Sequence, residues 1–392
     1  MNRNKQITYR HLQYVFIILF ISICYCTKEE STDTTKSTNQ GTDWKIFRGD
    51  PQLSGISRTT LPENIKLLWS FKTEDDIKSS PVIGNDHVFI GSNDGFIYAL
   101  KLGNGELVWK FDTGDAVEAP PLFLNNTIYI GSLNGLFFAL DALTGKIKWK
   151  FVTEEQISGS ANWYATIKNE TLIIFGSYDN IMYCLNAETG KKVWAFETGN
   201  FINGAPAILD GKVVFGGCDA VLHVLSAENG EEETFLEAGS YIAGSAALEK
   251  DRAYFGHYEG KFLCGDILQN KIIWEYEDEE YGDAFFSSPA ISGDKVIVGS
   301  RDNNLHCINK TNGKKNWIFR TRDIVDSSPV ICKGKVVFGS EDGRLYIINL
   351  NDGKQTWSYE IGGAIISSPA VAKGKIVVGA DDGRIYTFGE EK

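Results

Sequence analysis

Tryptophan recurs along this chain about every 40 residues, and this repeat constrains the fold more than any other feature. The residues concerned are Trp69, Trp109, Trp149, Trp194, Trp274, Trp317 and Trp357. The gap of 80 residues between Trp194 and Trp274 equals two periods, and its midpoint is Thr234. Self-similarity at a fixed period predicts a repeat architecture in which each copy is one supersecondary unit. The sequence therefore predicts eight copies, one of which has lost its tryptophan.

Three further signals accompany the tryptophans and define the unit. A step of small residues such as Ser327-Ser328-Pro329 opens each copy, and the strand-like run that follows ends in a glycine such as Gly339. A turn such as Asp342-Gly343 comes next, and these residue types tolerate the positive φ of tight hairpins. A second glycine precedes most tryptophans by four residues, as Gly353 precedes Trp357. Together these signals predict that each copy forms four short antiparallel strands.

Four such strands in one copy are the unit of a propeller blade. A lone four-stranded sheet cannot bury both of its apolar faces, whereas blades packed in a ring bury both. We therefore expect an all-β fold, namely an eight-bladed β-propeller with four antiparallel strands per blade. A strand at Leu67–Phe71 precedes the first copy, and the last copy ends without a tryptophan strand. We expect this N-terminal strand to close the ring by completing the last blade.

The first residues are typical of an export signal. The apolar run at residues 14–26 follows a basic start and is shorter than the ~20 residues of a membrane-spanning helix. Residues 27–43 contain no apolar residue, which predicts a flexible polar tether. The chain then divides into a signal peptide (1–26), a tether (27–43) and a propeller (44–392).

An apolar run, a cysteine and a polar tether, in this order, resemble the start of bacterial lipoproteins. The resemblance implies a membrane anchor through a lipid on Cys26, with Cys24 as the alternative. A cleaved secreted protein and an uncleaved anchor are the other readings of the same segment.

Composition and spacing argue against several functions. The net charge of −12 and the pI of about 5.0 disfavour a nucleic-acid partner, because an acidic surface repels phosphate. The five cysteines beyond residue 26 form no C-x-x-C pair, and we expect buried thiols. The histidines show no metal-ligand spacing, and no G-x-S-x-G nucleophile motif occurs. We therefore expect no metal, no cofactor, no enzymatic activity and a monomeric propeller.

The repeat resembles that of the PQQ-like repeat β-propeller family, in its small-residue–Pro strand, G-S-x-D-G turn, Y-A-L strand and T-G-x-x-x-W strand. The lead-in Trp44–Asp50 is also similar to the segment before the first blade of that family. Within it, the length and anchor-like start resemble the short lipid-anchored propellers of the BamB kind, which serve outer-membrane β-barrel assembly. Quinoprotein dehydrogenases of the family are longer, and commonly carry a Cys-Cys pair that this chain lacks.

The BamB-like resemblance implies a non-catalytic lipoprotein on the periplasmic side of the outer membrane. It would act as a protein-binding scaffold for envelope proteins, a β-barrel assembly complex among them. The alternatives are an extracytoplasmic ligand-binding or sensor propeller, secreted or periplasmic, and a PQQ-dependent dehydrogenase.

Two features are candidate partner-binding sites. Trp163 and Tyr164 lie off the tryptophan period, in a five-residue insertion, which fits either an exposed anchor or local packing. The loops that enter the first strand of each blade and the second-to-third-strand turns are expected on one face, and that face is rich in acids. These acids serve either solubility or the docking of a basic partner, and the candidate contributors are Glu118, Asp283, Asp323 and Asp326.

Overall fold

The computed structural model describes residues 43–280 and 282–391, and these form part of one compact unit, Gln40–Lys392. The predicted signal peptide, with Cys24 and Cys26, lies outside the described residues, as does almost all of the predicted tether. The described residues form strands and turns and contain no helix. No helix able to cross a membrane is therefore present among them.

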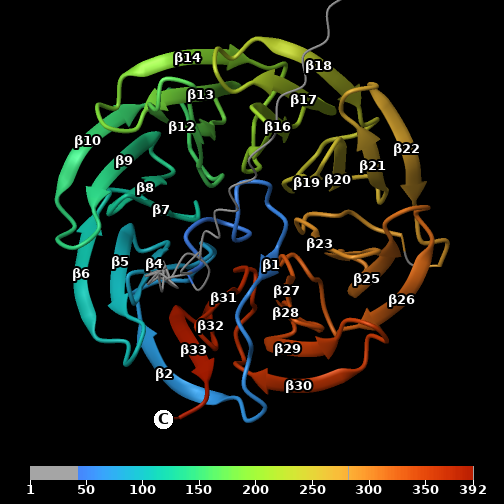
Figure 1. Ribbon diagram of the computed structural model, residues 1–392. Helices are drawn as coiled ribbons and strands as arrows, with labels where there is room; N and C mark the ends of the chain where they lie inside the picture. Colours follow the sequence, from blue (N-terminus) through green and yellow to red (C-terminus); the bar gives the residue numbers. More distant parts are fainter. Residues whose placement is uncertain (1–42, 281, 392) are drawn as a thin grey trace, which may run out of the picture. The chain divides into compact units, whose positions relative to one another are not determined.

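Eight sheets follow one another around a central axis (Figure 1), which confirms the predicted eight-bladed propeller. Within each blade, the first strand lies nearest the axis and the later strands follow it outward. Blade 1 contains β3 (Val82–Gly84), β4 (His87–Gly91), β5 (Phe96–Lys101) and β6 (Leu107–Asp112); blade 2 contains β7 (Leu122–Leu124), β8 (Thr127–Gly131), β9 (Leu136–Asp141) and β10 (Ile147–Val152); blade 3 contains β11 (Asn162–Ala165), β12 (Thr171–Gly176), β13 (Ile181–Asn186) and β14 (Lys192–Glu197); blade 4 contains β15 (Ala207–Leu209), β16 (Lys212–Gly216), β17 (Val221–Ser226) and β18 (Glu232–Glu237).

The second half of the ring repeats this arrangement. Blade 5 contains β19 (Ala247–Glu249), β20 (Arg252–Gly256), β21 (Phe262–Asp266) and β22 (Lys271–Tyr276); blade 6 contains β23 (Ala290–Ser292), β24 (Lys295–Gly299), β25 (Asn304–Asn309) and β26 (Lys315–Arg320); blade 7 contains β27 (Val330–Cys332), β28 (Lys335–Gly339), β29 (Arg344–Asn349) and β30 (Gln355–Glu360); blade 8 contains β31 (Ala370–Ala372), β32 (Lys375–Ala380) and β33 (Arg384–Gly389).

The outer strand of blade 8 comes from the other end of the chain. Strand β2 (Lys66–Lys72) pairs antiparallel with β33, with Leu67 opposite Phe388 and Phe71 opposite Ile385. In Figure 1 the blue β2 lies beside the red β33. The ring is therefore closed as predicted, and no sheet edge is left at the seam.

The repeat tryptophans lie between blades. Each indole Nε1 donates a hydrogen bond to a backbone carbonyl of the next blade. The pairs are Trp69 with Leu102, Trp109 with Ala142, Trp149 with Ala187, Trp194 with Ala227, Trp274 with Lys310, Trp317 with Leu350 and Trp357 with Ile65. The last of these pairs joins blade 7 to the segment that enters β2, so the series continues through the closure.

The apolar core is distributed among the blade interfaces. Buried clusters join neighbouring blades, and in one of them Phe137 of blade 2 stacks on Phe175 of blade 3 with ring centroids 3.9 Å apart. Each sheet thus buries both faces, which explains why the middle strands are apolar on both sides.

A segment at the start of the described chain crosses the axis at one end of the ring (Figure 1). We call residues 44–60 the strap; it contains β1 (Ile56–Ser57), which pairs in parallel with β27. The strap meets the innermost strands of the blades in chain order. The hydrogen-bonded pairs are Trp44 with Ile83, Lys45 with Phe123, Pro51 with Asn162 and Ile208, Gln52 with Leu248, Ser54 with Ile291, Gly55 with Ile331, and Ser57 with Val371. All eight blades therefore bind one continuous segment.

Candidate functional site

Two sets of loops meet on one face of the propeller, which we call the loop face. In every blade, a residue of the second-to-third-strand turn donates its backbone N–H to a carbonyl of the loop that enters the first strand. The donor and acceptor pairs are Asn93 and Asp76, Leu133 and Ala116, Tyr178 and Gln156, Cys218 and Phe201, Tyr258 and Tyr241, Arg301 and Ala284, Glu341 and Ile324, and Asp381 and Ala364. The shared face that the sequence predicted is therefore present, and the strap lies at the other end of the ring.

Acids occupy one part of this face. Asp381 of blade 8 and Glu341 of blade 7 have raised pKa values, because burial disfavours their charged forms and neighbouring carboxylates repel them. The neighbour of Asp381 is Asp76, and that of Glu341 is Asp326. Carboxylates of blades 7, 8 and 1 therefore lie close enough on this face to repel one another.

Aromatic side chains occupy the opposite part of the loop face, over blades 3 to 5. We call Tyr178, Phe201, Tyr241 and Tyr258 the aromatic sector. The exposed fraction is 45% for Phe201, 52% for Tyr241 and 56% for Tyr258. Tyr178 stacks on Phe201 with ring centroids 5.2 Å apart and an interplanar angle of 8°. The aromatic sector thus places four rings on three adjacent blades of one face, and two of these rings stack across a blade boundary.

The sequence interpretation missed the aromatic sector. Phe201 and Tyr241 lie at the loop position that alanine fills in Ala116, Ala284 and Ala364, as the shared hydrogen-bond pattern shows. Comparison of the eight copies at that one position would have revealed it.

The four predicted acids all lie on the loop face, but in two different states. Glu118 binds Lys78 at 2.9 Å, and Asp326 binds Arg301 at 2.7 Å. Asp283 and Asp323 are exposed, and each accepts a hydrogen bond from the backbone N–H of the next residue. Only the last two therefore present a carboxylate without an ion pair.

Trp163 and Tyr164 are not gathered with these acids. Both lie on β11, and the extra residues lengthen the first-to-second-strand turn, which is at the strap end of blade 3. The Tyr164 hydroxyl lies close to Gly211, in the corresponding turn of blade 4. Trp163 packs against the buried cluster that contains Ile46 of the strap. Trp163 therefore lies at the opposite end of its blade from the loops that carry the acids, and its role in partner binding stays a prediction.

A cavity of about 180 Å³ lies on the axis and opens at the loop face. Phe47 of the strap lines it, together with small residues from the opening step of each blade. The lining residues next to the mouth are Lys78, Glu118, Ser158, Asn203, Ala243, Phe286 and Asp326. Arg301 lies over the Phe286 ring, with its guanidinium carbon 3.6 Å from the ring centre. Two ion pairs and one cation–π contact thus order the mouth.

The sequence matches the family described as outer membrane protein assembly factor BamB over residues 62–178, 158–233, 236–364 and 321–392. The chain belongs to this family. No characterised protein matches the sequence at a significant level.

Solved structures agree on the fold. BamB from Moraxella catarrhalis is 18% identical, with a TM-score of 0.71, and the match covers 83% of this chain and 100% of that chain. A europium-containing methanol dehydrogenase is 14% identical, with a TM-score of 0.75 over 89% of this chain and 98% of that chain. The quinohemoprotein alcohol dehydrogenase from Comamonas testosteroni is 14% identical, with a TM-score of 0.76 over 90% of this chain and 81% of that chain. These likenesses show the propeller fold alone.

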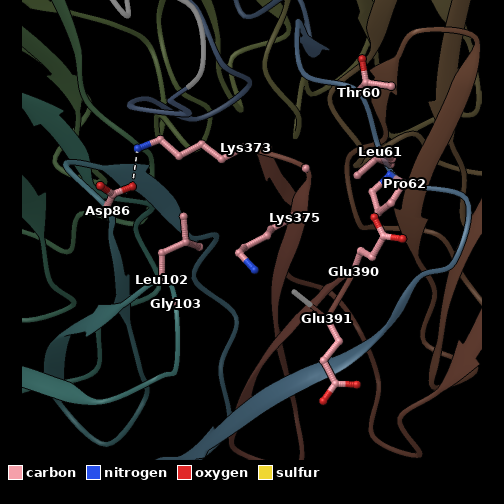
Figure 2. Close-up of a pocket in the computed structure, with 11 residues that line it drawn as sticks. Thr60, Leu61, Pro62, Asp86, Leu102, Gly103, Lys373, Lys375, Glu390 and Glu391 are labelled. Carbon is pink, nitrogen blue, oxygen red and sulfur yellow. Dashed lines mark hydrogen bonds and ion pairs between the residues drawn. The ribbon is translucent and has the colours of Figure 1, made fainter.

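A larger cavity of about 720 Å³ lies at the strap end, between blades 8 and 1 (Figure 2). Lys373 bridges Asp86 at 2.6 Å and Asp43 at 3.0 Å, and Leu61 and Pro62 of the segment after the strap form another side. The two ion pairs of Lys373 therefore connect the start of the propeller to the last blade. Among residues 43–280 and 282–391, no group of three or more His, Cys, Asp or Glu side chains could hold a metal ion.

Proposed function

We propose that this chain is a non-catalytic scaffold of the bacterial envelope, which holds a protein of the outer-membrane β-barrel assembly machinery on its loop face. Membership of the BamB family supports a role in outer-membrane protein assembly. The aromatic sector is the observation that carries the binding role, because exposed Tyr and Phe side chains anchor protein interfaces by burying a large area at low entropic cost.

The division of the loop face suggests how a partner would bind. The acids over blades 7, 8 and 1 would attract a basic surface and speed its approach. The aromatic sector would then bury apolar area and slow dissociation. Loops carried on a rigid ring suit this task, since they need not reorder when the partner arrives.

A scaffold role without catalysis is supported by the state of the titratable groups. The acids at the axial mouth, Glu118 and Asp326, are held in ion pairs. His306 is fully buried, bonds Asp302 of its own blade and Tyr276 of blade 5, and is not among the residues that line the axial cavity. A PQQ-dependent dehydrogenase is the rival function, and the absorption spectrum of the protein mixed with PQQ and calcium tests it. A saturable shift of the quinone band would favour the rival.

We also propose a lipid anchor on Cys26, or on Cys24, on the periplasmic side of the outer membrane. The order of apolar run, cysteine and polar tether supports it. Replacement of both cysteines by serine should move the protein from the membrane to the soluble fraction. Membrane association that survives the change, in a wild type that takes up no acyl label, would contradict the anchor.

The partner is tested by co-purification from crosslinked membranes. The variant Phe201→Ser/Tyr241→Ser should lose most of the assembly-machinery protein that the wild type retains. Ile167→Ser is the matched control, because Ile167 is 85% exposed on the strap-end turn of blade 3. Equal losses in both variants, or none in either, would contradict the proposed surface.

A further inference from the structure

The second serine of the small-residue step links neighbouring blades. Its hydroxyl oxygen accepts a hydrogen bond from the backbone N–H of the preceding blade at 2.8 to 3.0 Å. The N–H and hydroxyl pairs are Ala205 with Ser245, Ser245 with Ser288, Ser288 with Ser328, Ser328 with Ser368, and Ser368 with Ser80. The links form an unbroken arc from blade 4 through blade 8 to blade 1.

These bonds use the oxygen of each hydroxyl as acceptor and leave its O–H to be donated elsewhere. None of the five hydroxyls donates to a protein acceptor within residues 43–280 and 282–391. All five serines line the axial cavity. Five hydrogen-bond donors therefore line one side of a space of about 180 Å³.

The first serine of the same step behaves differently and serves as an internal comparison. The Ser327 hydroxyl donates to the Ser367 carbonyl at 2.9 Å, and the Ser367 hydroxyl donates to the Ser79 carbonyl at 2.8 Å. Their O–H groups are thus satisfied between blades, and neither residue lines the axial cavity. Adjacent serines of one motif therefore hold different hydrogen-bonding roles.

A buried cation lies beside the cavity floor. Arg48 of the strap is 1% exposed, and its guanidinium carbon lies 5.9 Å from the ring centre of Phe47, which lines the cavity. Its Nη atoms donate to three carbonyls, those of Pro289, Ser328 and Pro329, and its Nε has no partner in the described chain.

No carboxylate bonds this guanidinium. Asp50 attracts it through space, but the Asp50 carboxylate bonds Ser54 instead. Burial lowers the pKa of Arg48 to about 9, so the group stays charged at neutral pH. At the mouth, the charges of Lys78 and Arg301 cancel those of Glu118 and Asp326. Asp50 offsets the charge of Arg48 in the same way, so the site depends on its hydroxyl donors rather than on a net positive charge.

We propose that the axial cavity binds one oxyanion group, a carboxylate or a phosphate. Converging O–H donors match an acceptor-only group, and bonds to a charged acceptor are about twice as strong as neutral ones. The strap lies across the far end of the axis, so the ligand enters from the loop face. The anion is either a free small ion or the charged end of a longer molecule, such as the C-terminal carboxylate of a peptide. The site is independent of the scaffold role proposed above.

The test is isothermal titration calorimetry of the whole protein with inorganic phosphate and with N-acetyl-tyrosine, in a chloride buffer of constant ionic strength. Ser328→Ala removes a cavity donor and an inter-blade bond, whereas the control Ser327→Ala removes an inter-blade bond only. We expect Ser328→Ala to weaken binding about tenfold, as the loss of one bond to a charged group predicts. Ser327→Ala should stay within about twofold of the wild type, since no cavity donor is lost.

The two ligands distinguish the sources of the anion. Tighter binding of N-acetyl-tyrosine indicates a peptide carboxylate, and tighter binding of phosphate indicates a free phosphate or a phosphate ester. No heat of binding with either ligand, or equal weakening by Ser327→Ala and Ser328→Ala, overturns the proposal. If Ser328→Ala does not fold, Ser368→Ala with Ser367→Ala as control repeats the comparison one blade further on.

Discussion

The indole of Trp69 lies against the backbone of Gly105 in the neighbouring blade. A Cβ at Gly105 would come within 2.6 Å of the ring atom Cε3, closer than side chains tolerate. The same contact joins Trp109 to Gly145 and Trp317 to Gly353. The repeat tryptophan of one blade and the repeat glycine of the next blade therefore form one blade-to-blade contact.

This contact predicts the cost of a single methyl group. Gly105→Ala should lower the free energy of unfolding by about 1–3 kcal/mol, because the Cβ overpacks the interface and Gly105 has a φ of +72°. Gly103→Ala is the matched control, since a Cβ there meets nothing within 4 Å. Denaturant unfolding of both variants measures the difference, and equal stability would contradict the contact.

The exception to the repeat supports a second prediction. Blade 4 has Thr234 in place of tryptophan, and the facing position of blade 5 is Asn270 in place of glycine. The tryptophan and its glycine are thus missing together. Thr234→Trp combined with Asn270→Gly should be more stable than the two single changes predict, with a coupling of about 0.5–3 kcal/mol. Strict additivity in a double-mutant cycle would show that the pair is not coupled.

His223 predicts a pH dependence of stability. Its Nδ1 lies 2.6 Å from Glu232 and its Nε2 lies 2.9 Å from Asp219. Burial opposes protonation, but the hydrogen bonds and charges of the two carboxylates outweigh it and raise the pKa of His223. Protonated His223 therefore stabilises the fold fully below the unfolded pKa of about 6.5, and this stabilisation is lost as the pH rises through the folded pKa.

The matched variant is His223→Tyr, because Tyr183 occupies this position in blade 3 and bonds Asp179 at 2.8 Å. Urea unfolding of both proteins at several pH values measures the effect. The wild type should lose stability relative to the variant as the pH rises above about 6.5 and through the raised folded pKa of His223. The contribution of His257, whose pKa is lowered by burial, has the opposite sign but is common to both proteins. Parallel curves would contradict the role of His223.

The fold was predictable because packing repeats eight times and leaves a period in the sequence. The strap was not, although Trp44–Asp50 was noticed as a lead-in. Its contacts are mostly backbone hydrogen bonds, such as that between Pro51 and Ile208, and these place little constraint on residue type. Buried Arg48 binds carbonyls rather than an acid, so no partner residue in the sequence pointed to it.

The candidate site was predicted in part. Acids on entering loops were found because their position in the repeat fixes their face. Their ion pairs were not, because Arg301 of blade 6 binds Asp326 of the neighbouring blade 7. The position of Trp163 could not be predicted, because the sequence does not say which end of the strand an insertion lengthens.

The aromatic sector is the central claim, and site-specific photo-crosslinking in intact cells tests it most directly. A photoreactive residue at Tyr241 should crosslink to a protein of the outer-membrane assembly machinery, and one at Phe201 should capture the same protein. The same group at Ile167, exposed at the opposite end of blade 3, should not. Crosslinks to that machinery from Ile167 alone, or from none of the three positions, would contradict the account.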